Sequence, residues 1–161
     1  MHELHPQATR IATLLTRRNE TLAVSESSTG GLVSAALLAV PGASAFFMGG
    51  AVVYTATARH LLLGITEQDM QGIRSASEPY ARLAAHRVRT RFGTSWGIAE
   101  TGAAGPAGNR YGDAPGHTCL ALSGPADRVT TIETGQADRP ANMLRFAQAL
   151  LTFFETALSG S

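Results

Sequence analysis

The sequence predicts an α/β fold: a single three-layer α/β/α domain whose helices cover both faces of a mixed sheet of about five strands. Helical and strand-like segments alternate along the N-terminal part of the chain, which is typical of parallel strands joined by helices. Two strand-like segments then follow each other across a short turn, which indicates an antiparallel hairpin. With 161 residues, 44% of them hydrophobic, the chain is long enough for one compact core. We expect one domain over residues 1–161, with its core at about 7–158.

The first elements alternate between helix and strand. Apolar residues recur at helical spacing among arginines over residues 7–19, which predicts an amphipathic helix. Residues 21–25 are short and apolar, as expected of a buried strand. The apolar run 32–40 predicts a buried helix, since it follows two glycines and ends before a proline that blocks continuation. Residues 48–55 are expected to form the second strand, and residues 57–63 a short helix closed by a glycine.

The following helix has the clearest start and stop signals. Ser77 is a suitable N-cap, Pro79 lies in the first turn, and apolar residues follow one face up to Gly93. Residues 95–100 predict a third strand. This strand leads into a loop rich in glycine, alanine and proline over residues 101–116, and loops of this length in compact domains are usually functional or disordered.

The C-terminal part predicts a hairpin and a last helix. Residues 117–123 and 129–134 are strand-like and are separated by a turn-forming segment. A helix is expected to begin after Asp138 as its N-cap and to bury apolar side chains along one face. The last residues, 158–161, are expected to be disordered.

The charge balance favours a small polar ligand over nucleic acid or a membrane. The chain carries 13 basic and 12 acidic residues, a net charge of +1, and therefore has no broad electrostatic field. Its apolar runs are shorter than the roughly 20 residues that a membrane-spanning helix needs. Because the N-terminal segment lacks the basic and then apolar layout of a signal peptide, we expect a cytoplasmic location.

The residue types exclude several kinds of chemistry. The single Cys119 excludes an intramolecular disulfide, and the five histidines show no metal-ligand spacing, so no metal site is expected. All 13 basic residues are arginines, which excludes any mechanism that requires a lysine of this chain. His86 is expected to be exposed and inert, whereas His60 and His117 lie near candidate loops and are candidates for proton transfer.

The segment after the first expected strand is the first candidate site. Ser27, Ser28 and Thr29 supply hydroxyls. Gly30 and Gly31 permit close approach of a ligand. The unpaired N–H groups at the start of a helix can bind an anion. A plainer explanation is that one hydroxyl only caps the helix, and this segment alone favours the cap.

A second candidate lies in the glycine-rich loop. Thr101, Gly102, Gly105 and Pro106 also follow a strand. Two such loops at one sheet edge would form a crevice, the usual ligand position in α/β folds. Each loop alone has a structural explanation, and both being only structural is less expected. Neither matches a phosphate-binding P-loop or a dinucleotide fingerprint, so the signal is generic.

Tyr54 and Arg59 are the remaining candidates. An arginine at the end of a short helix can hold a carboxylate or a phosphate with two hydrogen bonds. A solvated surface charge is the commoner fate of an arginine.

Four collinear segments together resemble the CinA C-terminal domain family, the competence/damage-inducible family whose active members are nicotinamide-nucleotide amidases. The segments read SESSTGG, VVYTATAR, ASEPYARLAAHRV, and ETGAAGPAG followed by APGHTCLAL. The resemblance implies hydrolysis of the carboxamide of nicotinamide mononucleotide to the nicotinic acid nucleotide and ammonia. It implies no metal and no cofactor, a small nucleotide or amide as substrate, and an assembly of identical chains.

The resemblance also implies roles for individual residues. Ser27 corresponds to the expected nucleophile, and backbone N–H groups near Gly30 would hold the developing oxyanion. Tyr54 and Arg59 fall on the second motif of the family as electrostatic helpers. Ser28, Thr29 and Gly31, with Thr101, Gly102, Gly105 and Pro106 of the third motif, would bind the substrate.

The sequence departs from the family pattern at two of these positions. Ser28 replaces a cysteine, a near-isosteric change. Arg59 replaces a lysine, and a guanidinium stays charged and cannot accept a proton. The base would then be another group, with His60, Glu26 and Glu100 suggested by the sequence.

Three functional hypotheses follow. The first is a serine amidohydrolase acting on a pyridine nucleotide or a related amide. The second is a protein that binds a nucleotide or another small anion but has lost the chemistry, which the arginine at position 59 favours. The third takes the arginine-rich helix 82–91 as a protein or nucleic-acid interface, and the near-zero net charge argues against nucleic acid.

Overall fold

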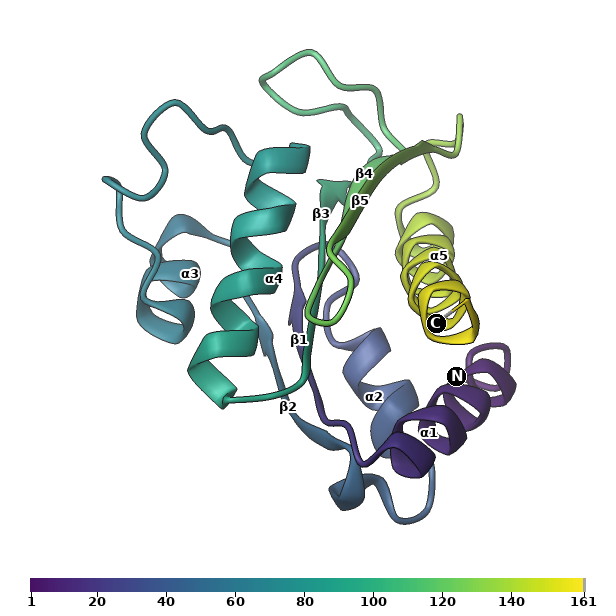
Figure 1. The fold of residues 1–161 in the computed structure, drawn as a ribbon. Helices are drawn as coiled ribbons and strands as arrows, with labels where there is room; N and C mark the ends of the chain where they lie inside the picture. The colour runs from purple at the N-terminus through teal and green to yellow at the C-terminus, as the bar shows by residue number, and fades with distance from the viewer. Residues whose placement is uncertain (161) are drawn as a thin grey trace.

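The sheet of this protein has five strands in the order β2-β1-β3-β4-β5 (Figure 1). The computed structural model describes residues 1–160. Three neighbouring strands run parallel, and the last two add antiparallel pairs at one side. The predicted mixed five-stranded α/β architecture is therefore confirmed. The strands are β1 Leu22–Glu26, β2 Phe47–Val52, β3 Trp96–Ala103, β4 His117–Ser123 and β5 Arg128–Glu133.

One face of the sheet is covered by α1 His5–Arg18, α2 Leu32–Leu38 and α5 Arg139–Ser159 (Figure 1). A short 3-10 helix, Ala43–Ala45, precedes β2. These helices and the sheet share one large apolar cluster. At its centre the Trp96 and Phe154 rings meet edge to face, with their centroids 5.3 Å apart. Such a contact adds to the stabilisation from burial alone.

The other face is covered by α3 Ala56–Leu63 and α4 Glu78–Phe92. Small residues on α4 let it lie close to the sheet. A Cβ atom on Gly97 of β3 would stand 2.1 Å from the Ala85 carbonyl oxygen, so only glycine fits at this crossing. The N-caps of these helices are side-chain hydroxyls: Thr55 accepts from Ala58 N at 3.1 Å, and the predicted cap Ser77 accepts from Tyr80 N at 3.3 Å.

The third strand is longer than the sequence predicts. It runs to Ala103, so Thr101 and Gly102 lie in a strand and the loop begins only after them. The reason is pairing that local sequence does not reveal: these two residues pair with Cys119 and Thr118 of β4. A Cβ on Gly102 would stand 2.4 Å from the carbonyl oxygen of the neighbouring strand, which explains a glycine inside the ladder.

The expected disorder of the C-terminus is wrong for residues 158–160. Helix α5 continues to Ser159, and Leu158 is fully buried in the cluster that α1 shares. The stripe of buried residues on α5 therefore extends one turn further, because α1 packs against the end of the helix. Residue 161 lies outside the described residues. Within residues 1–160, no helix combines the length and apolar character needed to cross a bilayer.

Replacing Leu158 with alanine tests this docking. We expect Leu158→Ala to lower the free energy of unfolding by about 2–5 kcal/mol, because a fully buried leucine leaves a cavity. Urea denaturation followed by circular dichroism measures the loss. Leu38→Ala is the matched control, since Leu38 is also helical but 66% exposed. Equal, small losses in both variants would mean that the end of α5 does not dock.

Candidate functional site

The candidate site lies where β1 and β3 end, beside the loop 104–116 that crosses the top of Figure 1. Two small cavities meet there at Tyr54. We call them the Ser27 cavity, of about 180 Å³, and the Arg139 cavity, of about 170 Å³. The Ser27 cavity is lined by Ser27, Val53, Tyr54, Thr55, Ala56, Arg59, Ser75, Tyr80, Thr101 and Arg110. The Arg139 cavity is lined by Ser28, Tyr54, Gly102, Ala103, Ala104, Gly105, Ala107, Gly108, Asn109 and Arg139.

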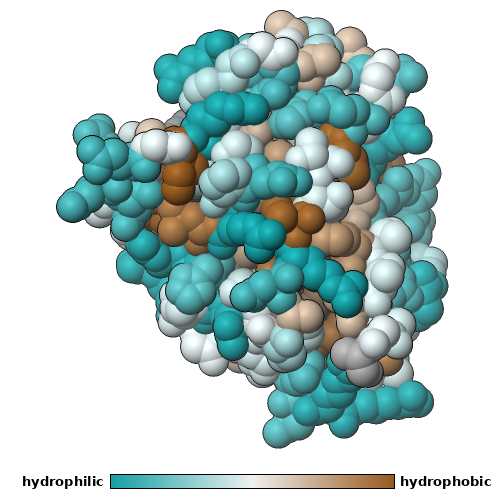
Figure 2. Space-filling view, turned by 45° about the horizontal axis from the view of Figure 1, so that its top comes forward, coloured by the Kyte–Doolittle hydropathy of each residue, from teal (hydrophilic) through white to brown (hydrophobic). Residues whose placement is uncertain are grey.

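This end of the molecule is mostly polar. Figure 2 turns the top of Figure 1 toward the reader and shows hydrophilic residues over most of the surface, with apolar residues gathered in a few places between them. Arginines line both cavities. The surroundings therefore suit a small polar or anionic ligand.

The turn between β1 and α2 is held from one side by the carboxylate of Glu26. This side chain is fully buried. It accepts hydrogen bonds from the backbone N–H groups of Gly31, Val33 and Ser34, at 3.2, 3.0 and 2.9 Å. The N-cap residue of α2, Gly31, makes no side-chain cap bond, so Glu26 supplies the cap that the sequence assigned to a serine or threonine hydroxyl.

Glu100 of β3 holds the same turn from the other side. Its buried carboxylate accepts from the backbone N–H groups of Ser27 and Thr29 at 3.1 and 3.0 Å. It also accepts from three hydroxyls, those of Ser28, Thr29 and Thr118, at 2.5, 3.1 and 2.9 Å. These donors are what makes burial of a carboxylate tolerable. Both glutamates that the sequence suggested as bases are therefore committed to the fold.

Ser27 and Ser28 face different cavities because of this anchoring. Ser27 is half-buried and lines the cavity of that name, whereas the Ser28 hydroxyl donates to Glu100. The N–H groups of Gly30 and Gly31 are occupied by the Ser27 carbonyl and by Glu26. Among the N–H groups of residues 27–34, only that of Ser28 lacks an acceptor in the described part of the chain. The backbone N–H that remains available to an anion at this turn is therefore that of Ser28 rather than those of the glycine pair.

Arg59 lies on the far wall of the Ser27 cavity. Its Nη1 donates to Ser75 Oγ at 2.9 Å, and its guanidinium carbon stands 5.3 Å from the centroid of the Tyr80 ring. Burial raises the pKa of Tyr80, an effect that the nearby Arg59 partly opposes. These two contacts hold the guanidinium in place, which favours a binding role over a mobile surface charge.

Arg139, at the first position of α5, is a site residue that the sequence did not reveal. Its Nη1 donates to the Gly105 carbonyl at 2.6 Å and its Nη2 to the Tyr54 hydroxyl at 2.9 Å. The guanidinium also lies over the Tyr54 ring, with 5.9 Å to the centroid. Tyr80, Ser75, Arg110 and Asn109 were missed as well. Only the position of Arg139 after a predicted helix cap offered a signal.

The other predicted residues take varied places. Thr101 lines the Ser27 cavity, and its buried hydroxyl accepts from Ala76 N at 3.2 Å. Gly102 and Gly105 line the Arg139 cavity. The residues that line neither cavity are Thr29, Gly30, Gly31 and Pro106.

No classical base faces Ser27. His60 lines a separate hollow of about 410 Å³ that it shares with Arg59 and Glu67. His117 has both ring nitrogens in hydrogen bonds. Within residues 1–160, the lining of the Ser27 cavity contains no histidine, lysine or carboxylate. Its titratable groups are the phenols of Tyr54 and Tyr80 and the guanidinium groups of Arg59 and Arg110.

Comparisons with solved structures agree with this fold. The chain superposes on a CinA superfamily protein from Klebsiella pneumoniae with a TM-score of 0.91 at 24% identity, covering 98% of this chain and 99% of that one. It superposes on the competence/damage inducible protein CihA from Agrobacterium tumefaciens with a TM-score of 0.86 at 28% identity, covering 97% and 95% of the two chains.

Sequence comparisons identify the family. The chain is 42% identical to a CinA-like protein of Gloeobacter violaceus over 86% of its own length and 32% of that protein. It is 36% identical to a CinA-like protein of Anaeromyxobacter dehalogenans over 89% of its own length and 35% of that protein. The chain thus spans about a third of the length of these curated relatives. Since the pattern of the CinA C-terminal domain also matches residues 4–158, this chain belongs to the CinA C-terminal domain family.

Proposed function

We propose that this protein is a serine amidohydrolase that hydrolyses the carboxamide of nicotinamide mononucleotide or of a related nucleotide amide. The observation that supports this most is the joining of two cavities at Tyr54: one holds Ser27 and Arg59, the other holds Arg139. A substrate with an amide at one end and a phosphate at the other matches this pair, with the amide at Ser27 and the phosphate at Arg139.

In the proposed reaction, Ser27 Oγ forms a bond to the amide carbon and the carbonyl oxygen becomes an oxyanion. The N–H of Ser28, free of intrachain acceptors, and the Arg59 guanidinium are the donors for this charge. Collapse of the tetrahedral intermediate breaks the carbon–nitrogen bond, and ammonia leaves with an added proton. Water then hydrolyses the ester on Ser27, which releases the nicotinic acid nucleotide.

Removal of the Ser27 proton is the step that this site catalyses least well. Arg59 remains a cation and acts only as a hydrogen-bond donor. Because the cavity lining lacks a histidine, a lysine or a carboxylate among the described residues, the proton of Ser27 passes to water within the cavity. We therefore propose a slow amidase. General base catalysis typically contributes about 10²–10⁴-fold in rate, which this site forgoes.

The same observation favours one second candidate. A protein that binds a nucleotide in these cavities without hydrolysing it needs Arg59, Arg139 and Tyr54 but no base. The two candidates share a ligand and differ only in turnover.

Ammonia release from nicotinamide mononucleotide distinguishes them. We expect slow release by the wild type and none by Ser27→Ala, because the nucleophile is removed. Ser44→Ala, at an exposed position, is the control. Binding of the nucleotide by calorimetry without ammonia release would establish the second candidate instead. An undiminished rate in Ser27→Ala would show that another group attacks the amide.

Restoring a lysine at position 59 tests the missing base. We expect Arg59→Lys to raise kcat, with the gain growing as pH rises toward the ordinary lysine pKa of about 10.4, because the amine form can accept the serine proton. A pH–rate profile measures this. Arg110→Lys, on the lining of the same cavity, is the matched control. A rate below wild type at every pH would contradict base limitation.

Neutralising Arg139 tests where the phosphate lies. Arg139→Gln should weaken binding of nicotinamide mononucleotide about tenfold, the change expected for one charge-assisted hydrogen bond. Nicotinamide riboside, which has no phosphate, should bind the variant and the wild type equally. Calorimetry with both ligands measures the difference. Equal losses for the two ligands would place the phosphate elsewhere.

A further inference from the structure

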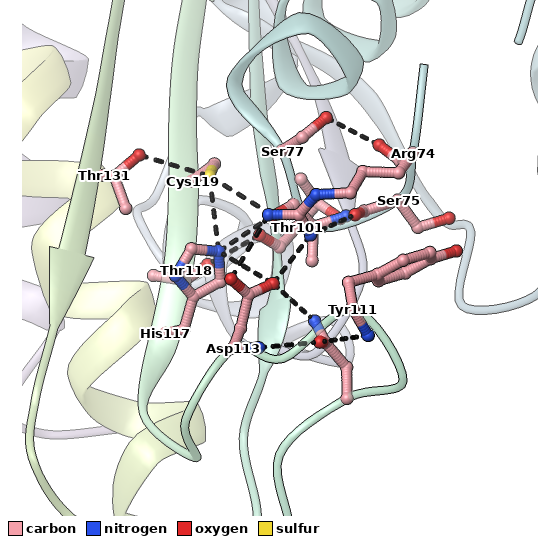
Figure 3. A network of polar contacts seen from close by, with 12 residues as sticks. Arg74, Ser75, Ser77, Thr101, Tyr111, Asp113, His117, Thr118, Cys119 and Thr131 are labelled. Atoms are coloured by element: carbon pink, nitrogen blue, oxygen red, sulfur yellow. Dashed lines mark hydrogen bonds and ion pairs between the residues drawn. The ribbon is translucent and has the colours of Figure 1, made fainter. Parts of the chain in front are cut away.

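A charged network centred outside the two cavities joins two loops that flank them (Figure 3). Its centre is Asp113, in the loop between β3 and β4. The carboxylate accepts from Arg74 Nη1 at 2.7 Å and Nη2 at 3.2 Å, a two-point ion pair. It also accepts from Asn109 Nδ2 at 2.7 Å. The Arg74 guanidinium in turn lies 5.1 Å from the Tyr111 ring centroid, so this ring adds a second contact to the arginine of the pair.

The hydrogen-bond partners of His117, which lies beside Asp113 at the start of β4, favour the cationic form of its ring. Its Nδ1 lies 2.6 Å from Glu133 Oε1 and its Nε2 lies 2.8 Å from the Ala76 carbonyl oxygen. A hydrogen on each ring nitrogen would satisfy both acceptors, so these contacts favour the imidazolium form. Asp113 Oδ2 stands 3.6 Å from Nε2 and adds a second negative charge. The side chain is 7% exposed.

The surroundings of His117 agree with this protonation. Burial by itself lowers the pKa of His117, but hydrogen bonds to Glu133 and Ala76 and the charge of Asp113 raise it above the ordinary value. The other groups that face this position are Arg74, the Cys119 thiol at 3.7 Å, and Glu78 through Thr131. Burial raises the pKa of Cys119, so the thiol stays neutral and adds no charge.

The network connects walls of the two cavities that are distant in sequence. Ser75, next to Arg74, lines the Ser27 cavity and accepts the hydrogen bond from Arg59. Asn109, which donates to Asp113, lines the Arg139 cavity, and its neighbour Arg110 lines the Ser27 cavity. Loss of the hydrogen bonds of Asp113 would therefore loosen Ser75, which supports Arg59, and would loosen one wall of each cavity at the same time.

We propose that Asp113 is a positioning residue: backed by the His117 imidazolium, its carboxylate holds the loop of Ser75 and the loop of Asn109 and Arg110 in register around the cavities. Its effect on turnover rests on the proposed function. The contacts themselves involve no substrate, so the positioning can be measured independently of any reaction.

Limited trypsin digestion of the folded protein measures the positioning. Arg110 is exposed in the held loop, so the Arg110–Tyr111 bond reports its freedom. We expect Asp113→Asn to speed cleavage there about tenfold, the change for a lost charge-assisted hydrogen bond. Asp127→Asn, an exposed acid at the β4–β5 turn, is the matched control. If Asp113→Asn does not fold, Arg74→Gln removes the same pair from a half-exposed position. Cleavage at the control rate in the folded variant overturns the proposal.

The pH profile separates positioning from simple packing. With the folded-state pKa of His117 raised, its support is present below about pH 6.5 and is lost as pH rises through the raised value. Cleavage at Arg110 should therefore accelerate with pH in the wild type, after correction with a peptide of the same loop. In His117→Gln the corrected rate should be independent of pH. A flat profile in the wild type contradicts the role of the imidazolium.

Turnover and binding of the nucleotide test whether the positioning by Asp113 matters to the cavities. Asp113→Asn should lower kcat/KM for nicotinamide mononucleotide about tenfold or more, because small displacements of site groups are costly. If the wild type only binds the nucleotide, the loss appears in Kd. Faster cleavage with unchanged kcat/KM and Kd would overturn the positioning role. If the wild type neither hydrolyses nor binds the nucleotide, the proposed function fails, and the digestion still decides whether Asp113 holds the loops.

Discussion

The site depends on two buried carboxylates, those of Glu26 and Glu100, which accept hydrogen bonds from the turn between β1 and α2. Together they accept hydrogen bonds from five backbone N–H groups and three hydroxyls. A buried carboxylate without such donors would be strongly destabilising, so turn and carboxylates stabilise each other. The turn is a tight one because the glycines at its end adopt positive φ, 62° at Gly30 and 101° at Gly31. Of its two serines, Ser27 lines one cavity and Ser28 lines the neighbouring one.

This arrangement occupies the carboxylates of Glu26 and Glu100 with hydrogen bonds, and neither residue lines the cavity of Ser27, the proposed nucleophile. Among residues 1–160, the lining of the Ser27 cavity holds no histidine, lysine or carboxylate. The Arg59 guanidinium on this lining contacts Ser75 and Tyr80. The site is therefore rich in hydrogen-bond donors and lacks strong proton acceptors. Such a site suits binding an anion and stabilising an oxyanion more than it suits activating a serine. Fast turnover needs a proton acceptor beside Ser27, whereas tight binding of an anion needs hydrogen-bond donors. The residues of this cavity meet the need for binding better.

Much of the fold could be predicted, because local signals and the final structure agree there. The caps Ser77 and Asp138 begin the helices that the sequence assigned to them. The errors lie where distant segments decide. Thr101 and Gly102 resemble a loop but pair with β4, and Leu158 resembles a frayed tail but packs with α1.

The residues of the candidate site also fall into those that sequence patterns predict and those that they do not. Ser27, Tyr54, Arg59 and Thr101 follow motifs, and the structure brings them to one cavity. Arg139, at the first position of α5, lines the neighbouring cavity, and Asp113, in the loop between β3 and β4, supports the cavity walls from outside. Single-sequence patterns do not reveal such contacts. Glu26 and Glu100 illustrate the opposite case. Their residue type suggested a chemical role, and only their hydrogen bonds reveal the structural one.

The most direct test of the account is mass spectrometry of protein quenched with acid during incubation with nicotinamide mononucleotide. Trypsin releases residues 19–59 as one peptide that contains both serines of the turn. We expect an ester of the nicotinic acid nucleotide on Ser27 of this peptide and no such ester in Ser27→Ala. An ester on Ser28 instead, or ammonia release that Ser27→Ala leaves undiminished, would contradict it.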